Sequence, residues 1–267
     1  MLDIEEIIKR SEKAFNGTER SNASCLWEEL SEFIMPSQSG NFHGEESPGI
    51  KKTGRVFDPY AVQANQDLAA AIHSTLTNPA TKWSNLRFKQ DDLNNAPDAV
   101  AWLQEVNKTI HTEFNESNFD TAISKNYQML TGLGTMVLFQ EVTQNANIYD
   151  GLNFEAIHLS QIAMAEGPKG NVDTVFRKFK MTGKQILQKW PDTSSLDVQA
   201  APDKEFEIVF CVKPNDPKKI KLNRAGLAPE NNRPFKAYYV LKTDQELLEE
   251  TGYNEFLFFE TSWQTQP

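Results

Sequence analysis

The four histidines are the side chains best suited to ligate a metal or to transfer a proton at neutral pH. They are far apart in the sequence, at His43, His73, His111 and His158. No two have the i, i+4 spacing that places two imidazoles on one face of a metal-binding helix. His73 lies within a predicted helix and is expected to be a structural histidine with its hydrogen bonds satisfied. The histidines therefore predict neither a metal site nor a catalytic site.

Two glycine patterns resemble nucleotide-binding loops but lack the residues that such loops need. Residues 49–54 have the glycine spacing of a P-loop, yet Arg55 and Val56 follow where a Lys and a Ser or Thr are required for phosphate and magnesium. Gly132 and Gly134 lack the third glycine of a dinucleotide fingerprint and are better explained as the end of a helix. The sequence thus predicts no cofactor.

Carboxylates and nucleophiles give no catalytic pattern either. The acidic doublets at 45–46, 91–92 and 249–250 lie in polar surroundings, whereas general acid–base catalysis needs burial that shifts a pKa. No Gly-x-Ser-x-Gly elbow occurs. Cys25 and Cys211 have no zinc-type spacing and are expected to be reduced, largely buried thiols in a cytosol-like compartment. We therefore predict no catalytic, cofactor-binding or metal-binding residue, and a protein that is not an enzyme.

Composition limits the remaining classes of protein. The chain has 267 residues, of which 39% are hydrophobic, so it can bury a core and is not wholly disordered. Its formal charge of −10 argues against a body that coats nucleic acid through counterion release. No apolar run reaches the ~18 to 20 residues of a membrane span, and the acidic N-terminus does not resemble a signal peptide.

Short basic clusters occur at 51–55, 177–180 and 218–221. Solvated surface is the default interpretation, and contact with phosphate or with an acidic neighbouring subunit is the alternative. In the second cluster, strand alternation places Arg177 on the same face as Val175 and Phe179. We expect this arginine to pair with a carboxylate or to reach an interface.

Hydrophobic periodicity predicts helices first and strands later. Helical spacing covers about 4–15, 22–35, 58–77, 97–114 and 119–133, with Asp58 as a cap and Pro59 at the first helical position. Short strands are expected at 83–88, 136–139, 152–157, 172–179, 206–212, 235–241 and 256–259, with a hairpin turn at Asp150–Gly151. Thr182 is expected to cap a short helix that ends at Trp190.

This order of elements predicts an α+β fold with mostly antiparallel strands. We expect a mainly helical region at 1–135, with a mobile Pro/Gly/Ser-rich loop at 36–54, and a strand-rich region at 136–267. Because the sequence stops directly after a strand-like run, we also expect it to be a fragment of a longer protein.

The chain resembles the head-to-tail connector (portal) proteins of short-tailed, T7-like bacteriophages. The likeness covers most of its length through the order and spacing of several segments rather than through one motif. These segments are Trp27-Glu28 leading to Pro36, the run 54–58, the alanine-bearing helix 68–72 closed by 76–79 and Trp83, the passage 127–135, and the run 170–182.

The resemblance implies a ring of twelve identical subunits at one capsid vertex of the virion, assembled in the host cytoplasm. Such rings nucleate head assembly with capsid and scaffold proteins, let a separate terminase motor feed double-stranded DNA inward, and hold the tail. Members are longer than this chain, so the channel-lining stem helix and the clip would follow residue 267, and these residues would form the outer wing. The resemblance identifies no channel-lining residue here.

For assembly, ring closure through head-to-tail interfaces makes three features candidate contacts: Ala69 to Ala71, the 36–54 loop, and acidic–basic pairs. Two other functions stay open from the residues alone. One is a double-stranded-DNA-binding adaptor that acts as a monomer or dimer, for which the basic clusters would have to converge on one face. The other is a hydrolase with an unrecognised site, for which the sequence offers no candidate pair.

Overall fold

The computed structural model describes residues 4–36, 42, 56–145, 148–168, 170–216, 218, 220 and 232–263. The chain forms two compact units, each assembled from distant segments. Unit 1 contains Met1–Trp27 and His158–Leu257, and unit 2 contains Glu28–Ile157 and Phe258–Pro267. Each unit holds helices and antiparallel strands, which confirms the predicted α+β class. In the part of the chain that is described, no helix combines the length and the apolar character of a membrane span.

Unit 1 is built on a five-stranded antiparallel sheet in the order β3-β4-β5-β6-β7. Its strands are β3 (Ile162–Glu166), β4 (Val172–Thr182), β5 (Glu205–Pro214), β6 (Phe235–Leu241) and β7 (Glu246–Tyr253). In the turn from β3 to β4, the Gly170 amide donates to the Gly167 carbonyl at 3.0 Å, and Gly170 has the positive φ of 75° that glycine tolerates best.

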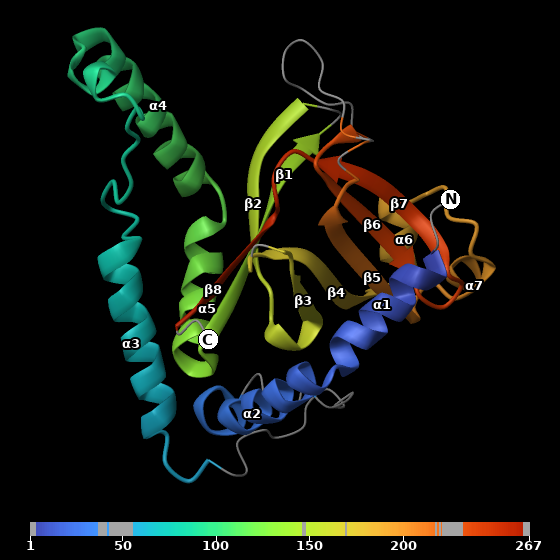
Figure 1. Cartoon of the computed structure of the whole chain (residues 1–267). Coiled ribbons are helices and arrows are strands. Elements are labelled where there is room, and N and C mark those ends of the chain that lie inside the picture. The colour runs from blue at the N-terminus through green and yellow to red at the C-terminus, as the bar shows by residue number, and fades with distance from the viewer. Residues whose placement is uncertain are drawn as a thin grey trace. The chain divides into compact units, whose positions relative to one another are not determined.

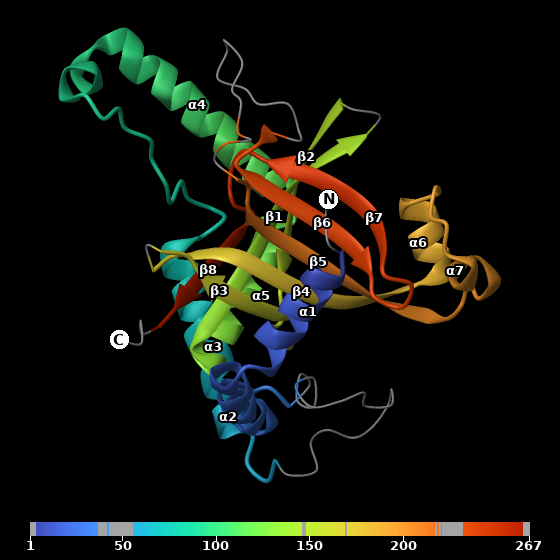
Figure 2. The same cartoon turned by 45° about the vertical axis from the view of Figure 1, so that its right-hand side comes forward.

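Helix α1 (Ile4–Asn16) lies on one face of this sheet (Figure 2). Its apolar stripe buries Ile7 and Ile8 against side chains that alternate along the strands and share that face: Phe176, Val209, Cys211, Tyr238 and Val240. After Gly17 the chain continues as α2 (Thr18–Ile34), where Arg20 donates to the carbonyls of Leu159 and Ile162 at 2.5 and 3.2 Å. The N-terminal helices are thereby fastened to strands that follow more than a hundred residues later.

Two short helices, α6 (Gly183–Lys189) and α7 (Leu196–Ala200), follow β4. The predicted cap at Thr182 is confirmed, and it forms a capping box with Gln185. The linker after α6 is held by Glu246 on β7, whose carboxylate accepts from the Thr193 hydroxyl at 2.8 Å and from the Ser194 amide and hydroxyl at 2.7 Å each. Burial alone would raise the pKa of Glu246, but these hydrogen bonds outweigh it and the pKa lies below its usual value.

Unit 2 packs helices on a three-stranded antiparallel sheet in the order β2-β1-β8 (Figure 1). Its strands are β1 (Thr135–Asn145), β2 (Ile148–Ala156) and β8 (Phe258–Ser262). Its helices are the second part of α2, α3 (Tyr60–Leu76), α4 (Pro97–Glu116) and α5 (Phe119–Leu133), with the 3-10 turn η2 (Asp91–Asn95) before α4. Helices α3 and α5 lie side by side, and α5 packs on β1 and β2.

The core of unit 2 lies between α3, α5 and the sheet. It buries Ala69 of α3 with side chains from α5, β1 and β2, namely Ala122, Ile123, Tyr127, Leu130, Leu138 and Phe154. Ala69 is 4% exposed, so its small side chain serves close packing of α3 on α5. Helix α5 ends at Gly134, which adopts φ 80°, as the helix-end interpretation of this glycine predicted.

Three local predictions were wrong. Residues 83–88 form no strand but an unpaired extended segment, because Trp83 packs on helix side chains instead of on another strand. Asp150 and Gly151 lie inside β2, and the hairpin closes at the Asn145–Ile148 pair. Pro59 precedes the first helical residue instead of occupying it, although the Asp58 carboxylate still accepts from the Tyr60 amide at 2.9 Å.

Other elements differ from the predicted pattern in extent. Helix α2 begins at Thr18, four residues before its predicted start. The structure also contains β3, β7 and α7, which the periodicity did not indicate. Both units combine helices from the first half of the chain with strands from the second half.

Candidate functional site

The residues that could do chemistry are dispersed. His73 and His111 lie in unit 2 and His158 lies in unit 1, while His43 falls outside the described residues. Among the described positions, no group of three or more His, Cys, Asp or Glu side chains could hold a metal ion. The P-loop-like run 49–54 also lies outside the described residues. The expectation that both cysteines are largely buried holds for Cys211 and is wrong for Cys25, which is exposed on α2. Burial raises the pKa of the Cys211 thiol to about 12, so this cysteine is a poor nucleophile.

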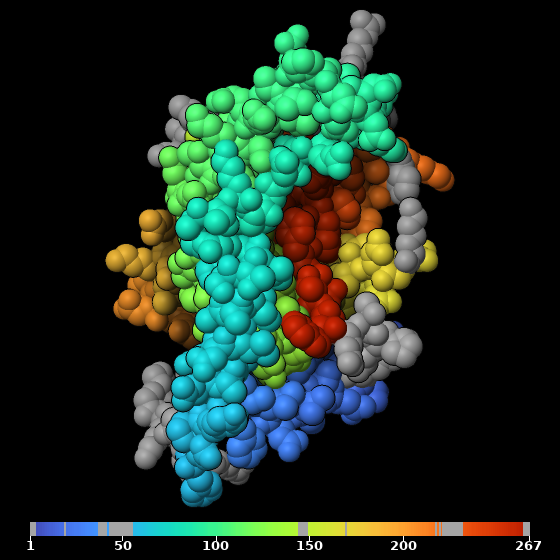
Figure 3. Space-filling view, turned by 90° about the vertical axis from the view of Figure 1, so that its left-hand side faces the viewer, coloured from blue at the N-terminus to red at the C-terminus, as the bar shows by residue number. Residues whose placement is uncertain are grey.

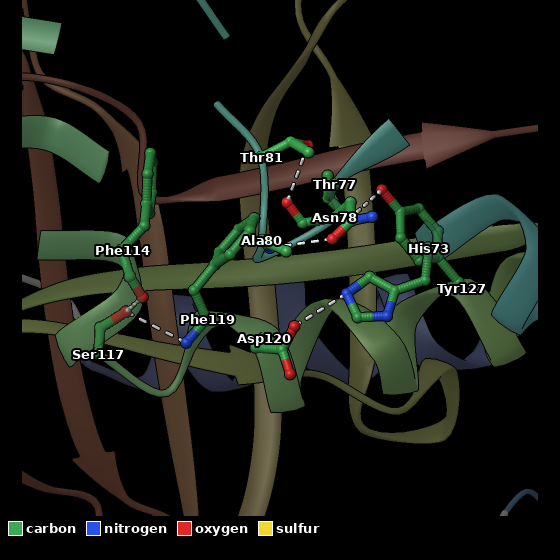
Figure 4. Close-up of polar contacts among 10 residues, drawn as sticks. All are labelled: His73, Thr77, Asn78, Ala80, Thr81, Phe114, Ser117, Phe119, Asp120 and Tyr127. Atoms are coloured by element: carbon green, nitrogen blue, oxygen red, sulfur yellow. Dashed lines mark hydrogen bonds and ion pairs between the residues drawn. The ribbon is translucent and has the colours of Figure 1, made fainter. Parts of the chain in front are cut away.

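His73 and His111 each hold two elements together. The Nε2 atom of His73 on α3 lies 3.0 Å from the Asp120 carboxylate on α5, and its ring is 6.0 Å from the ring of Tyr127 (Figure 4). The Nε2 atom of His111 on α4 lies 3.2 Å from the Ser84 hydroxyl and 3.1 Å from the Ser84 carbonyl. These contacts agree with the structural role expected for His73 and extend it to His111.

The acidic doublets divide between solvent and structural contacts. Asp91 and Asp92 are exposed in η2, as expected, and the doublet at 45–46 lies outside the described residues. In the doublet at 249–250, Glu249 is half-buried and Glu250 is exposed, and both also make specific contacts. Glu249 accepts from the Trp190 indole nitrogen at 2.7 Å, and Glu250 pairs with the ammonium of Lys236. Strand β7 thus uses its carboxylates to anchor neighbouring elements.

The central basic cluster is partly internal to unit 1. The Arg177 guanidinium lies 5.0 Å from the centroid of the Phe179 ring, on the face that alternation predicted. The Lys178 ammonium lies 4.2 Å from the centroid of the Phe15 ring, and burial, with repulsion from Lys242, lowers its pKa. The cluster at 51–55 lies outside the described residues, and of the cluster at 218–221 only Lys218 and Ile220 are described. Arg177 and Lys178 thus contact aromatic side chains of their own unit.

The most distinctive surface of unit 2 is the segment 82–106, which we call the arm. It comprises the extended residues 82–90, η2 and the first half of α4, and Figure 1 shows this half of α4 extending beyond the end of α5. Three large apolar side chains of the arm are exposed: Trp102 at 58%, Leu86 at 42% and Leu93 at 38%. Exposed apolar groups on one projecting segment are typical of a contact surface.

Two tight turns fix the roots of the arm (Figure 4). Where the chain leaves α3, the Asn78 side-chain oxygen accepts from the Ala80 amide at 2.9 Å, and the Thr77 hydroxyl lies 3.2 Å from the Tyr127 hydroxyl. Where α4 returns to α5, the Ser117 hydroxyl accepts from the Phe119 amide at 3.1 Å. Both roots are therefore bonded to α5, the first through Tyr127 and the second through Phe119.

Aromatic packing joins the first root to the second. The Trp83 ring stacks on the Phe119 ring at 5.7 Å and also contacts the rings of Phe114 and His111, each at 5.5 Å. Sequence periodicity predicted a strand at 83–88 and did not indicate that Trp83 packs between α4 and α5. It gave no signal for the exposure of Trp102, which lies four residues before Val106 and so borders the apolar stripe formed with Val100 and Leu103.

Comparison with known proteins gives a family match over most of the chain. The family model described as bacteriophage head to tail connecting protein matches residues 5–267. The chain belongs to this family. The resemblance to phage head-to-tail connectors that the sequence segments indicated is thus confirmed.

Two portal proteins are similar to this connector-family chain. The portal protein of Salmonella phage epsilon15 is 25% identical over 257 residues, which cover 92% of this chain and 44% of that protein. The probable portal protein of Bordetella phage BPP-1 is 25% identical over 250 residues, which cover 90% and 43% respectively. The chain therefore spans less than half the length of these curated relatives.

Within a connector, the candidate assembly contacts acquire definite positions. Ala69 is buried inside unit 2 and is unavailable to a neighbour, whereas Ala70 and Ala71 are exposed on α3. In the 36–54 loop only Pro36 and Phe42 are described, so that contact lies otherwise outside the described residues. The arm and α3 are two of the surfaces on which the described residues expose large apolar side chains, among them Trp102 and Leu68.

Proposed function

We propose that this chain forms part of a structural portal subunit. Such subunits make a ring at one capsid vertex, through which double-stranded DNA is packaged and ejected and to which the tail attaches. The family match over residues 5–267 carries the proposal. Portal and connector proteins are structural, which fits a chain in which His73 and His111 hold elements of unit 2 together. The chain is not proposed to be an enzyme.

We further propose that these residues supply a wing-like part of the subunit and that the ring contains twelve copies. The family resemblance supports the copy number, and the projecting arm supports a role in contacts between subunits. The partners that follow are capsid and scaffold proteins, a terminase motor and tail proteins, with assembly in the host cytoplasm. The formal charge of −10 suits a body that does not grip DNA by phosphate neutralisation.

A measurement of particle mass and symmetry tests the proposal. The complete protein is purified and examined by mass photometry and by negative-stain electron microscopy, with and without its scaffold protein. We expect ring-shaped particles with twelve-fold symmetry. A protein that stays monomeric at high concentration even with scaffold would refute the ring.

The adaptor alternative makes a different prediction. A DNA-binding monomer or dimer would shift double-stranded DNA in a gel, and its affinity would fall steeply with added salt. The described residues do not favour this result, since Arg177 and Lys178 lie over phenyl rings of their own unit. We expect no shift at physiological salt, and strong salt-dependent binding by monomers would favour the adaptor.

A further inference from the structure

We propose that the arm of one subunit docks along the outward face of α3 on a second copy of this chain. The inference rests on the proposed ring, because it names the two surfaces through which neighbouring subunits meet. Both surfaces belong to unit 2, and each is exposed.

The arm is a preformed structure with an apolar surface. The Asn94 side chain bridges both backbone groups of Phe88: its oxygen accepts from the amide at 2.8 Å and its nitrogen donates to the carbonyl at 2.9 Å. The Phe88 ring stacks on Trp102 at 6.0 Å, and the Asn107 side chain donates to the Ser84 carbonyl at 3.2 Å. Because these bonds hold the arm before any partner binds, docking costs less conformational entropy than ordering a loose loop.

The outward face of α3 is an uncharged, partly apolar strip. At ~100° per residue, Tyr60, Ala64, Leu68 and Ala71 fall within about 80° of the helix circumference. All four are exposed, with Tyr60 at 76% and Leu68 at 48%. Figure 3 shows α3 (cyan) at the surface with its length open to the viewer. We call these four residues the α3 strip.

Charge complementarity selects a second copy of the chain as the partner. Residues 82–90 contain Lys82, Arg87 and Lys89 and no acid, and all three are exposed and pair with no carboxylate in the described part of the chain. Residues 56–81 contain Asp58 and Asp67, both exposed, and no Lys or Arg. The acids of the arm, Asp91, Asp92, Asp98 and Glu105, all lie in η2 and the first half of α4. The basic segment 82–90 beside the acids of 56–81 therefore favours association over repulsion and sets the orientation of contact.

Size and residue type agree with this pairing. An extended run of nine residues reaches about 30 Å, and a helix of 17 residues is about 26 Å long, so the arm can follow most of α3. Trp, Tyr and Arg are the residues enriched at interface hot spots, and the arm presents Trp102 and Arg87 while the strip presents Tyr60. Since the two surfaces differ, the contact is head-to-tail and can repeat around a ring.

Cross-linking between two single-cysteine proteins tests the contact. One carries Leu86→Cys on the arm and the other carries Leu68→Cys on the α3 strip, and both carry Cys25→Ser because Cys25 is exposed. Buried Cys211 is kept. The two proteins are mixed with a short bis-maleimide. Because each protein carries a single engineered cysteine, a cross-linked heterodimer joins the arm of one molecule to the α3 strip of another. The control partner carries Leu196→Cys, an exposed leucine on α7 of unit 1.

We expect about tenfold more heterodimer from the Leu86→Cys and Leu68→Cys mixture than from the control mixture, because docking raises the effective thiol concentration. The reaction is run on the 267-residue chain and on the assembled complete protein. Rings that form without this cross-link overturn the inference and leave the proposed function intact. A complete protein that forms no ring refutes the proposed function, whereas the cross-link on the 267-residue chain tests the contact separately. Leu86→Cys cross-linking to itself at the same yield would replace head-to-tail docking with an arm-to-arm contact and also overturn the inference.

A charge exchange provides a second test that does not depend on the thiols. We expect Arg87→Glu in the arm protein to reduce heterodimer yield about three- to fivefold, as for loss of one exposed ion pair. Asp67→Arg in the strip protein should act similarly, and the two together should recover most of the yield. If the combined variants cross-link no better than either alone, Arg87 and Asp67 do not face one another and the proposed alignment is wrong.

Discussion

Replacing Trp83 with alanine should detach the arm from the core of unit 2. The Trp83 ring stacks on Phe119 and contacts Phe114 and His111, so the substitution removes three ring contacts and leaves a cavity beside α5. A fully buried Trp→Ala change costs about 3 to 5 kcal/mol, and Trp83 is only half-buried. We therefore expect the free energy of unfolding to fall by about 2 to 3 kcal/mol.

Urea denaturation followed by far-UV circular dichroism measures this loss. With an m-value of about 2 kcal/mol per molar urea, the midpoint should fall by roughly 1 M. Limited trypsin digestion reports the arm itself, and cleavage after Lys82, Arg87 and Lys89 should become faster because the segment no longer lies against α4. The matched control is Trp102→Ala, which removes an exposed indole at the other end of the arm. Its midpoint should change by less than half as much.

Two results would refute this reasoning. If Trp83→Ala and Trp102→Ala lower the urea midpoint equally, the ring cluster at the root does not stabilise unit 2 more than the exposed stack does. If Trp83→Ala is destabilised without faster cleavage of the arm, Trp83 stabilises the core but does not hold the arm in place.

Three further predictions concern packing, helix termination and pH. Ala69→Leu should cost about 1 to 3 kcal/mol by overpacking α3 on α5, whereas Ala70→Leu on the exposed side should change the free energy of unfolding by less than about 0.5 kcal/mol in the same urea assay. Gly134→Ala should lower thermal stability by about 1 kcal/mol, because Gly134 has φ 80°; an unchanged melting temperature would contradict this. Glu246→Gln should cost about 1 kcal/mol at pH 7, after discounting for solvent exposure. Because the folded-state pKa of Glu246 is lowered, its stabilisation is present above the unfolded pKa and is lost as pH falls through the folded pKa. The difference between wild type and Glu246→Gln should therefore shrink below about pH 4, and a constant difference would contradict the assignment.

Local signals in the sequence were sufficient wherever neighbouring residues decide the conformation. The limits of α5 were predicted to the residue, since Gly134 supplies a left-handed end that few other residues adopt. The capping box at Thr182 depends on a side chain only three residues away. The same local reasoning supported the α+β class and, through the order of several segments, the connector family.

Elements whose partners are distant in sequence were less predictable. Strand β7 carries three carboxylates whose partners the sequence does not indicate. In the structure Glu246 accepts from Ser194, Glu249 accepts from Trp190, and Glu250 pairs with Lys236. Residues 83–88 have strand-like composition, but no neighbouring strand pairs with them and Trp83 instead finds the rings of α4 and α5. Propensity is a weak guide where tertiary contacts of this kind decide the outcome.

The sequence by itself determined the kind of protein: its segments follow the connector order, and most of its helices precede its strands. Only the tertiary structure decided which surfaces are free. It buried Ala69 while leaving Ala71 exposed two residues later, and it turned 82–106 into a projecting arm. The physical reason is that exposure depends on which distant segment covers a residue, and periodicity specifies a face of an element without specifying what lies against it.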